Sequence, residues 1–228
     1  MAKQDHTKII SGKDLGQLAL DDFCPRCFWL ERHNGKYPQI FPGIFSTLDS
    51  LTKKSVQRSF IKHSRQPDWL PLADIQRVVD FKQIKVPTEY GGWTLTGTPD
   101  DVFQLTDGTF LIADYKTARY SENQDNLLPM YRVQLNAYAY TLPKQGIGPI
   151  SRLALIYCEP NENLDTDIDF KLTFTIHTHE IPLDTSEIPK LLLRAREILD
   201  SEYPPTANPS CKGICAWVEQ VYQNGDLD

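Results

Sequence analysis

Two acidic groups on either side of a short hairpin are the residues of this chain best suited to chemistry. Asp100 follows a turn that contains glycine and proline, and Asp114 opens the triplet Asp114-Tyr115-Lys116 at the end of an apolar segment. Side chains alternate along a strand, so Asp114 and Lys116 project from the same face of a sheet. If Asp100 lies on the adjacent strand, the two carboxylates meet and repel each other unless a cation separates them.

A divalent cation that prefers oxygen ligands, such as Mg²⁺, is the simplest partner for these carboxylates. Proteins hold Mg²⁺ through one or two carboxylates together with waters and phosphate oxygens. An ammonium group beside it, here Lys116, could orient a water and stabilise charge on a phosphate. Together these groups indicate metal-dependent hydrolysis of phosphodiesters. Taken by itself, however, Asp114-x-Lys116 is better explained as a solvated strand end, because exposed strand ends are often charged.

The composition defines the class of protein that must carry these groups. The chain has 228 residues with 40% hydrophobic and 11% aromatic content, enough to fill a core and too apolar for a disordered chain. We expect a single domain over residues 1–228. The N-terminus lacks the apolar stretch of a secretory signal, and no run reaches the roughly 18 apolar residues of a membrane span, so we expect a cytoplasmic protein with no membrane partner. The net charge of -6 argues against coating of nucleic acid but allows a local basic groove.

Hydrophobic periodicity predicts the elements that position the acidic groups. Helical spacing predicts a short helix near Leu15 and Leu18 with Ser11 as its N-cap, a second short helix over 25–34 that Pro25 opens, and longer helices over 44–63, 130–142 and 187–199. Strands are expected over 78–86, 92–97, 101–105 and 110–116, forming an antiparallel meander, and over 152–158 and 169–180. This order of elements predicts one α/β domain.

The motifs agree with one another in order and separation. They are Gly97-Thr98-Pro99-Asp100, Ile112-Ala113-Asp114-Tyr115-Lys116-Thr117, and Gln134-x-x-x-Tyr138 on a helix. As a set they resemble the RecB-like branch of the PD-(D/E)XK nuclease superfamily, whose pattern is Gly-x-Pro-Asp, a hairpin, Asp-x-Lys-Thr and a Gln-x-x-x-Tyr helix. The resemblance implies a restriction-endonuclease-like α/β core, a mixed central sheet flanked by helices.

The resemblance also implies a role for each motif residue. Asp100 and Asp114 would bind Mg²⁺ or Mn²⁺, the Tyr115 carbonyl would add a third oxygen, Lys116 would be the catalytic lysine, and Gln134 with Tyr138 would complete the site. Residues four apart share one helix face, which agrees with the last assignment.

One family element is replaced in this chain. The branch commonly has a histidine, or elsewhere a glutamate, as a further metal ligand on the helix before the sheet. Here Asp49 is the nearest acidic residue after Gly43. Its carboxylate can bind Mg²⁺ or Mn²⁺, although an aspartate near a helix N-terminus is also favoured by the helix dipole alone.

Four of the five cysteines form two close pairs near the ends of the chain: Cys24-x-x-Cys27 and Cys211-x-x-x-Cys215. By spacing alone, four thiolates favour a structural Zn²⁺ site. The resemblance favours an iron-sulfur cluster of the [4Fe–4S] type joining the termini, as in the CRISPR-associated RecB-like exonucleases, where one cysteine precedes the nuclease core and three follow it. Here Cys27 would replace the missing third downstream cysteine. The end segments 11–36 and 204–220 would then form a cluster subdomain, and Cys158 would be a buried apolar side chain.

A basic stripe is the candidate surface for nucleic acid. Lys54, Arg58, Lys62 and Arg65 recur at a spacing of three to four residues and could contact phosphates near the metal site. A solvated helix face explains the same spacing equally well.

From these residues and the resemblance we expect a metal-dependent DNA nuclease that acts on single-stranded DNA or DNA ends. Repair, recombination and defence are the processes that the resemblance suggests. The alternatives are a catalytically inactive nucleic-acid-binding module with a structural metal cluster and a zinc-stapled protein-interaction domain. Any helicase, CRISPR or repair partner would be a separate chain, because the sequence contains no helicase motif. Exonuclease and endonuclease action, and DNA and RNA substrates, stay open at this stage.

Overall fold

A five-stranded mixed sheet forms the centre of the computed structural model, which describes residues 8–36, 42–121, 126–161 and 171–223. The strands are β1 (Ile9–Ser11), β2 (Ile75–Val78), β3 (Ile84–Pro87), β4 (Thr94–Gly97), β5 (Asp101–Leu105), β6 (Phe110–Lys116), β7 (Ile150–Pro160) and β8 (Phe174–Ile181). The helices are α1 (Gly12–Gly16), α2 (Pro25–Asn34), α3 (Gly43–His63), α4 (Leu128–Thr141), α5 (Glu187–Leu199) and α6 (Ile214–Gln223), with 3-10 turns η1 (Gln17–Ala19) and η2 (Leu142–Gln145).

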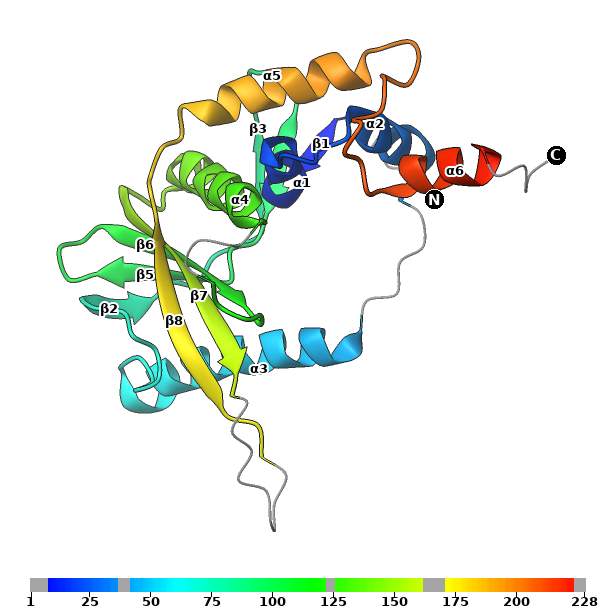
Figure 1. Cartoon of the computed structure of the whole chain (residues 1–228). Helices are drawn as coiled ribbons and strands as arrows, with labels where there is room; N and C mark the ends of the chain where they lie inside the picture. Colours follow the sequence, from blue (N-terminus) through cyan, green and yellow to red (C-terminus); the bar gives the residue numbers. More distant parts are fainter. Residues whose placement is uncertain (1–7, 37–41, 122–125, 162–170, 224–228) are drawn as a thin grey trace, which may run out of the picture.

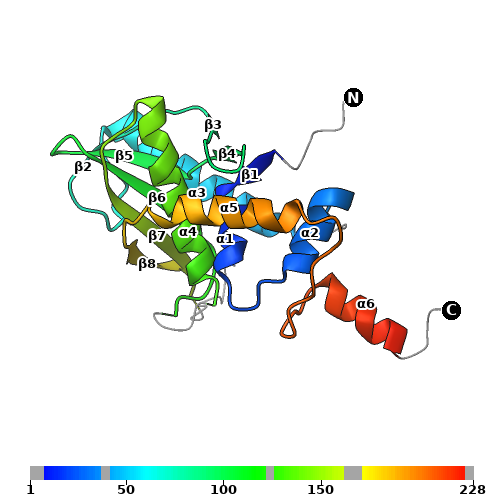
Figure 2. The same ribbon diagram turned by 90° about the horizontal axis from the view of Figure 1, so that it is seen from above.

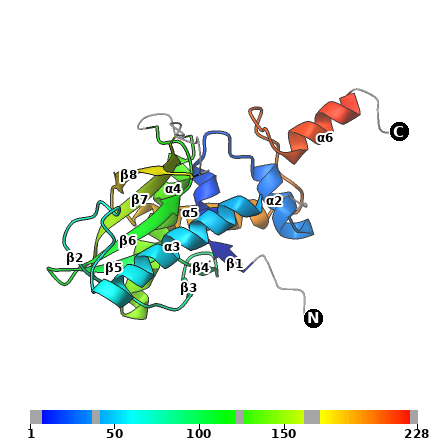
Figure 3. The ribbon, with the colours of Figure 1, turned by 90° about the horizontal axis from the view of Figure 1, so that it is seen from below.

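The large sheet has the order β2-β5-β6-β7-β8 (Figure 1). Its strands pair antiparallel except β6 and β7, which are parallel. Parallel neighbours need a crossover connection, and α4 supplies it between β6 and β7. Helix α4 packs on one face of the sheet and α3 on the other, where Figure 3 shows it lying across β5 and β6. This is the expected α/β arrangement, a restriction-endonuclease-like core with a mixed sheet between helices.

Alternation along β6 decides which side chains face each helix. Ile112 packs with Leu135 of α4, whereas Ala113 and Tyr115 pack in the cluster that contains Val56 of α3. The period of two residues places the next even-numbered side chains, Asp114 and Lys116, on the α4 side. The polar side chains at the end of β6 therefore point to the same side of the sheet as α4.

A second sheet, in the order β1-β4-β3, packs with α1, α4 and α5 (Figure 2). Helix α1 approaches α4 closely because two of its residues have no side chain. A Cβ on Gly12 would lie 3.3 Å from the Ala137 Cβ, and a Cβ on Gly16 would overlap the Met130 carbonyl. Ser11 caps α1 as expected, since its hydroxyl accepts a hydrogen bond from the Asp14 amide at 3.0 Å.

Most predicted helices are confirmed, and two predictions about strands are wrong. The segment 78–86 is not one strand: β2 packs in the cluster on the α3 side, whereas Ile84 and Val86 of β3 pack on the α4 side, so the chain must cross between two sheets. The meander is also interrupted, because β4 pairs with β3 and β1 while its Leu95 packs beside α5.

Helix α6 was not predicted. Strand β8 begins at Phe174, and residues 169–170 of the predicted strand lie outside the described residues. No described helix is both long and apolar enough to cross a membrane.

Substituting Gly97 by alanine should destabilise the protein by about 1–3 kcal/mol, as overpacking does. A Cβ there would overlap Cε1 of Tyr138 and lie 3.2 Å from its Cδ1. Thermal unfolding measures the effect, at about 2–4 °C per kcal/mol for a chain of this size. Gly43→Ala is the matched control, because a Cβ at Gly43 meets nothing within 4 Å. Equal melting temperatures for the two variants would contradict the steric role of Gly97.

A partly buried ion pair joins α1 to α2. Asp14 contacts Arg32 at 3.0 Å and Lys36 at 3.1 Å. Burial opposes ionisation, but the charges of Arg32 and Lys36 outweigh it and hold the pKa of Asp14 below 3.8. A lowered carboxyl pKa stabilises the fold above the unfolded-state value, and this contribution is lost as the pH falls through the folded-state pKa.

Asp14→Asn should therefore lower stability by about 2 kcal/mol at neutral pH, because it removes the negative charge that pairs with Arg32 and Lys36. The difference from the wild type should narrow as the pH falls below 3.8. Urea unfolding at several pH values measures it. A difference that is independent of pH would show that the substitution acts through packing rather than charge.

Candidate active site

The acidic motif residues lie in one open cavity of about 520 Å³. It forms where α1, the start of α3, the turn between β4 and β5, the end of β6 and α4 meet. The lining residues are Lys13, Phe45, Ser46, Asp49, Asp100, Asp114, Tyr115, Lys116, Thr117 and Gln134. Segments far apart in the sequence thus contribute one site.

Asp114 is the most deeply buried acid of the cavity, with 3% of its surface exposed. Its Oδ1 accepts a hydrogen bond from Gln134 Nε2 at 3.2 Å. Its Oδ2 lies 2.5 Å from Lys116 Nζ, but it accepts no hydrogen bond of normal geometry from the described residues. A buried carboxylate oxygen in that position has capacity for another cationic ligand.

Asp100 lies in the turn just before β5, not on the adjacent strand. Its Oδ2 accepts a hydrogen bond from the Tyr115 amide at 2.7 Å, which fixes it beside the end of β6. Burial and then the nearby charge of Asp114 raise the pKa of Asp100 to about 6, against the hydrogen bond from Lys53. A buried acid whose ionisation is opposed by a neighbouring carboxylate marks a site that favours a cation.

Gln134 and Tyr138 act as one unit on α4. Gln134 Nε2 donates to the Tyr138 hydroxyl at 2.9 Å as well as to Asp114, and both side chains are buried. The Tyr138 ring fits against Gly97, so the glycine of the first motif and the tyrosine of the third motif are in direct contact. Gln134 Oε1 is buried and has no hydrogen-bond partner among the described residues.

Lys116 is held by an aromatic ring as well as by Asp114. Its Nζ lies 4.1 Å from the centroid of the Tyr131 ring, a cation–π contact, and 19% of its side chain is exposed. The ammonium group is therefore positioned beside Asp114 and still borders the cavity.

Asp49 lines the cavity, and a residue that the sequence analysis missed contacts it. Lys53 Nζ lies 2.7 Å from Asp49 Oδ2 and 2.7 Å from Asp100 Oδ1. The spacing of four residues signals the first contact. No local pattern signals the second contact, because Asp100 is distant in the sequence. In this structure the positive charge of Lys53 lies between the carboxylates of Asp49 and Asp100 and offsets part of their negative charge.

Asp101 is a second missed residue. Its buried Oδ2 accepts a hydrogen bond from the Tyr115 hydroxyl at 2.7 Å on the α3 side of the sheet. Burial raises the pKa of Asp101 to about 7. This hydrogen bond joins β5 to β6 next to Asp100 and Asp114. Asp101 therefore supports the site from the opposite face of the sheet.

The comparison with known families decides the identity of this arrangement. A family model, that of the PD-(D/E)XK nuclease superfamily, matches residues 44–220. The chain belongs to the PD-(D/E)XK nuclease superfamily. The matched region contains the motif residues and the downstream cysteines, whereas Lys13, Cys24 and Cys27 of this PD-(D/E)XK chain lie before it.

Solved structures with a similar arrangement share little sequence with this PD-(D/E)XK chain. A crystal structure of SSO0001 is 14% identical, with a TM-score of 0.45, covering 90% of this chain and 81% of that one. LHK-Exo in complex with dAMP is 11% identical, with a TM-score of 0.43 and coverages of 97% and 95%. A phage-related exonuclease from Haemophilus somnus 129PT is 15% identical, with a TM-score of 0.42 and coverages of 77% and 79%. No curated protein matches the sequence.

The basic stripe lies on the outer surface of this PD-(D/E)XK core. Lys54, Arg58 and Lys62 are exposed, and at about 100° per residue they lie on the side of α3 opposite the buried Val56. Arg65 follows the helix and pairs with Asp68. None of these four basic residues lines the acidic cavity. Contact with nucleic acid through this stripe stays a prediction, and it would involve a surface away from the cavity.

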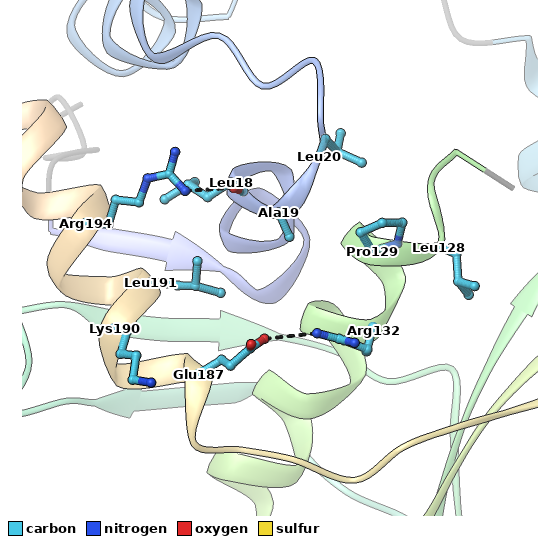
Figure 4. Close-up of a pocket in the computed structure, with 10 residues that line it drawn as sticks. All are labelled: Leu18, Ala19, Leu20, Leu128, Pro129, Arg132, Glu187, Lys190, Leu191 and Arg194. Atoms are coloured by element: carbon cyan, nitrogen blue, oxygen red, sulfur yellow. Dashed lines mark hydrogen bonds and ion pairs between the residues drawn. The ribbon is translucent and has the colours of Figure 1, made fainter.

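A larger cavity, of about 860 Å³, lies between η1, α4 and α5 (Figure 4). Its one acidic lining residue, Glu187, pairs with Arg132 at 3.2 Å, and Arg194 donates to the Leu18 carbonyl at 3.2 Å. Arg132 and Gln134 project from opposite sides of α4, since they are two residues apart on a helix. The larger cavity therefore lacks the acidic motif residues. The candidate active site is distinguished by its grouped carboxylates and lysine, not by its volume.

The four terminal cysteines converge as predicted, and they join the two ends of the chain. Their Sγ atoms all lie within 4.8 Å of one another. Cys24 and Cys27 lie at the start of α2. Cys211 lies in the loop before α6 and Cys215 in its first turn, and α6 packs beside α2 (Figure 1). Cys158 is buried on β7, apart from this group. The grouped thiols are suited to bind a metal ion.

Proposed function

We propose that this chain is a Mg²⁺- or Mn²⁺-dependent deoxyribonuclease that hydrolyses phosphodiester bonds in single-stranded DNA or at DNA ends. One observation carries the proposal: Asp100, Asp114 and Lys116 border a single cavity, with the lysine 2.5 Å from the buried carboxylate of Asp114. An ordinary surface ion pair does not explain these contacts, because Asp114 is buried and also accepts a hydrogen bond from the Gln134 side-chain amide of α4.

The donor set fits a divalent ion that prefers oxygen. Asp100 and Asp114 offer carboxylate oxygens, and the cavity leaves room for waters. Asp114 Oδ2 has Lys116 beside it but accepts no hydrogen bond of normal geometry from the described residues. When bound there, Mg²⁺ or Mn²⁺ would polarise a phosphate oxygen and lower the pKa of a bound water. The Tyr115 carbonyl is the proposed third oxygen ligand.

Asp49 has a less direct role under this proposal. Lys53 Nζ stands between Asp49 and Asp100, within 2.7 Å of each. An ion at either aspartate would compete with Lys53 for the oxygen that the lysine contacts. Asp49 is therefore proposed as an additional ligand where the lysine moves away.

The other residues of the cavity have separate proposed roles in catalysis and positioning. Lys116 donates to a phosphate oxygen or to the attacking water and stabilises the negative charge that develops. Gln134 keeps Asp114 oriented through its amide, and Tyr138 holds the glutamine in place. Lys13 and Ser46 border the same cavity and are available to phosphate oxygens.

One observation favours the alternative of an inactive nucleic-acid-binding module. Lys53 already supplies positive charge to Asp49 and Asp100, so part of the acidic group is neutralised without a metal. In the inactive module the lysine would keep this place and the protein would bind DNA without cutting it.

A cleavage assay on end-labelled DNA separates the two functions. Single-stranded DNA, blunt duplexes, closed circles and RNA of the same sequence are incubated with Mg²⁺, Mn²⁺ or a chelator. We expect metal-dependent cleavage of linear single strands or duplex ends, and the circles distinguish attack at ends from internal cleavage. Binding without cleavage in every metal would establish the inactive module instead. This assay needs no helicase or repair partner.

A further inference from the structure

The separations between the four cysteine sulfurs are short. Cys215 Sγ lies 3.1 Å from Cys27, 3.2 Å from Cys211 and 3.4 Å from Cys24, and Cys27 lies 3.7 Å from Cys211. The remaining pairs also fall within 4.8 Å. The group is therefore compact in every direction, not divided into two pairs.

These separations discriminate between the metals that four thiolates bind. A tetrahedral zinc ion with Zn–S bonds of about 2.3 Å places its sulfur ligands about 3.8 Å apart. In a [4Fe–4S] cluster each thiolate binds a different iron at the corner of a cube, which places the thiolates roughly 6 Å apart. The observed group needs to open by about half an ångström for one ion, but by more than 2 Å for the cluster.

The surrounding backbone supports negatively charged sulfurs at the compact spacing. Cys24 is the N-cap residue of α2, and Cys215 lies in the first turn of α6, so two helix N-termini point at the group. The Gly213 amide donates to Cys211 Sγ at 3.2 Å, and the amides of Cys27 and Asn208 donate to Cys24 Sγ. Such N–H donors stabilise metal-bound thiolates.

Gly213 also limits how far the group can expand. A Cβ at this position would lie 3.1 Å from Cys27 Sγ and 3.4 Å from Cys211 Sγ. The backbone thus lies against these two sulfurs and restricts their movement toward Gly213. Because the upstream ligands lie at the start of α2 and the downstream ligands in α6 and the loop before it, a bound ion would join the two ends of the chain.

We propose that the four cysteines bind one tetrahedral Zn²⁺ ion rather than the iron-sulfur cluster that the family resemblance implies. Divalent zinc binds such sites more tightly than divalent iron, which favours it where both are present. The proposal concerns the staple alone and holds whether or not the acidic cavity cleaves DNA.

Elemental analysis of anaerobically purified full-length protein tests the proposal. We expect about one zinc per chain, with no iron and no acid-labile sulfide. Exchange for Co²⁺ should give the visible spectrum of a tetrahedral thiolate site. Iron with sulfide at about four of each per chain would overturn the proposal. Iron without sulfide, or wild-type protein without metal, would overturn it as well.

The fifth cysteine provides a matched control. Cys215→Ser should abolish stoichiometric zinc binding, whereas Cys158→Ser should leave it unchanged, because Cys158 lies outside the group. If Cys215→Ser fails to fold, the zinc content and Co²⁺ spectrum of the wild type and of Cys158→Ser still decide the outcome. Loss of zinc in both variants alike would contradict the assigned ligands.

Discussion

Replacing Asp114 by asparagine should reduce metal-dependent DNA cleavage by about three orders of magnitude, because a metal contributes several kcal/mol of transition-state stabilisation. Asparagine keeps the size of the side chain and still offers Gln134 an oxygen acceptor at the position of Oδ1, so the fold should be retained. It removes the charge that pairs with Lys116 and that would bind the ion. Initial cleavage rates on labelled single strands, with Mg²⁺ titrated, measure the effect.

Asp80→Asn is the control for this substitution. Asp80 is exposed and does not line the acidic cavity, so the same change of charge there should leave the rate unaltered. Calorimetric titration with Mn²⁺ gives a second measurement: ion binding should weaken in Asp114→Asn and persist in Asp80→Asn. Full activity of Asp114→Asn would contradict the assignment of this carboxylate as a metal ligand of the catalytic site.

Lys116→Met should reduce cleavage by about a hundredfold, the usual loss when one charged donor to a developing anion is removed. Methionine retains the apolar stem against the Tyr131 ring, so packing is largely kept. In contrast to Asp114→Asn, this variant should bind Mn²⁺ at least as tightly as the wild type, because both carboxylates remain and a competing positive charge is gone. The combination of slow cleavage with retained metal binding distinguishes the catalytic lysine from a metal ligand.

The chain contains a close match for the control. Lys144 Nζ lies 4.2 Å from the Tyr140 ring, compared with 4.1 Å between Lys116 and Tyr131, but Lys144 is outside the acidic cavity. Lys144→Met therefore loses the same kind of cation–π contact without touching the site. Equal losses of activity in the two lysine variants would mean that Lys116 acts through stability alone.

Sequence reasoning succeeded where the relevant interactions are local. The period of two residues in β6 correctly placed Asp114 and Lys116 on one face. The spacing of Gln134 and Tyr138 correctly predicted that they share one side of α4. Pro25 and the cap at Ser11 likewise marked helix starts, because capping involves only neighbouring residues.

Sequence reasoning failed where distant segments compete for the same partner. Whether β4 continues the meander or pairs with β1 depends on Leu95 packing beside α5, and α5 begins about ninety residues later. The contact of Lys53 with Asp100 depends in the same way on where α3 lies against the sheet. Pairing partners are chosen by tertiary packing, and local propensity contains no information about them.

By itself the sequence determined which groups are available for chemistry: two aspartates and a lysine around a strand end, a glutamine and a tyrosine on one helix face, and two terminal pairs of cysteines. Only the tertiary structure decided that Asp100 lies in a turn, that Lys53 stands beside it, and that the four sulfurs lie within 4.8 Å. The physical reason is that residue types fix which ligands are available, whereas the distances between them, which select the ion, are set by how helices and sheets pack.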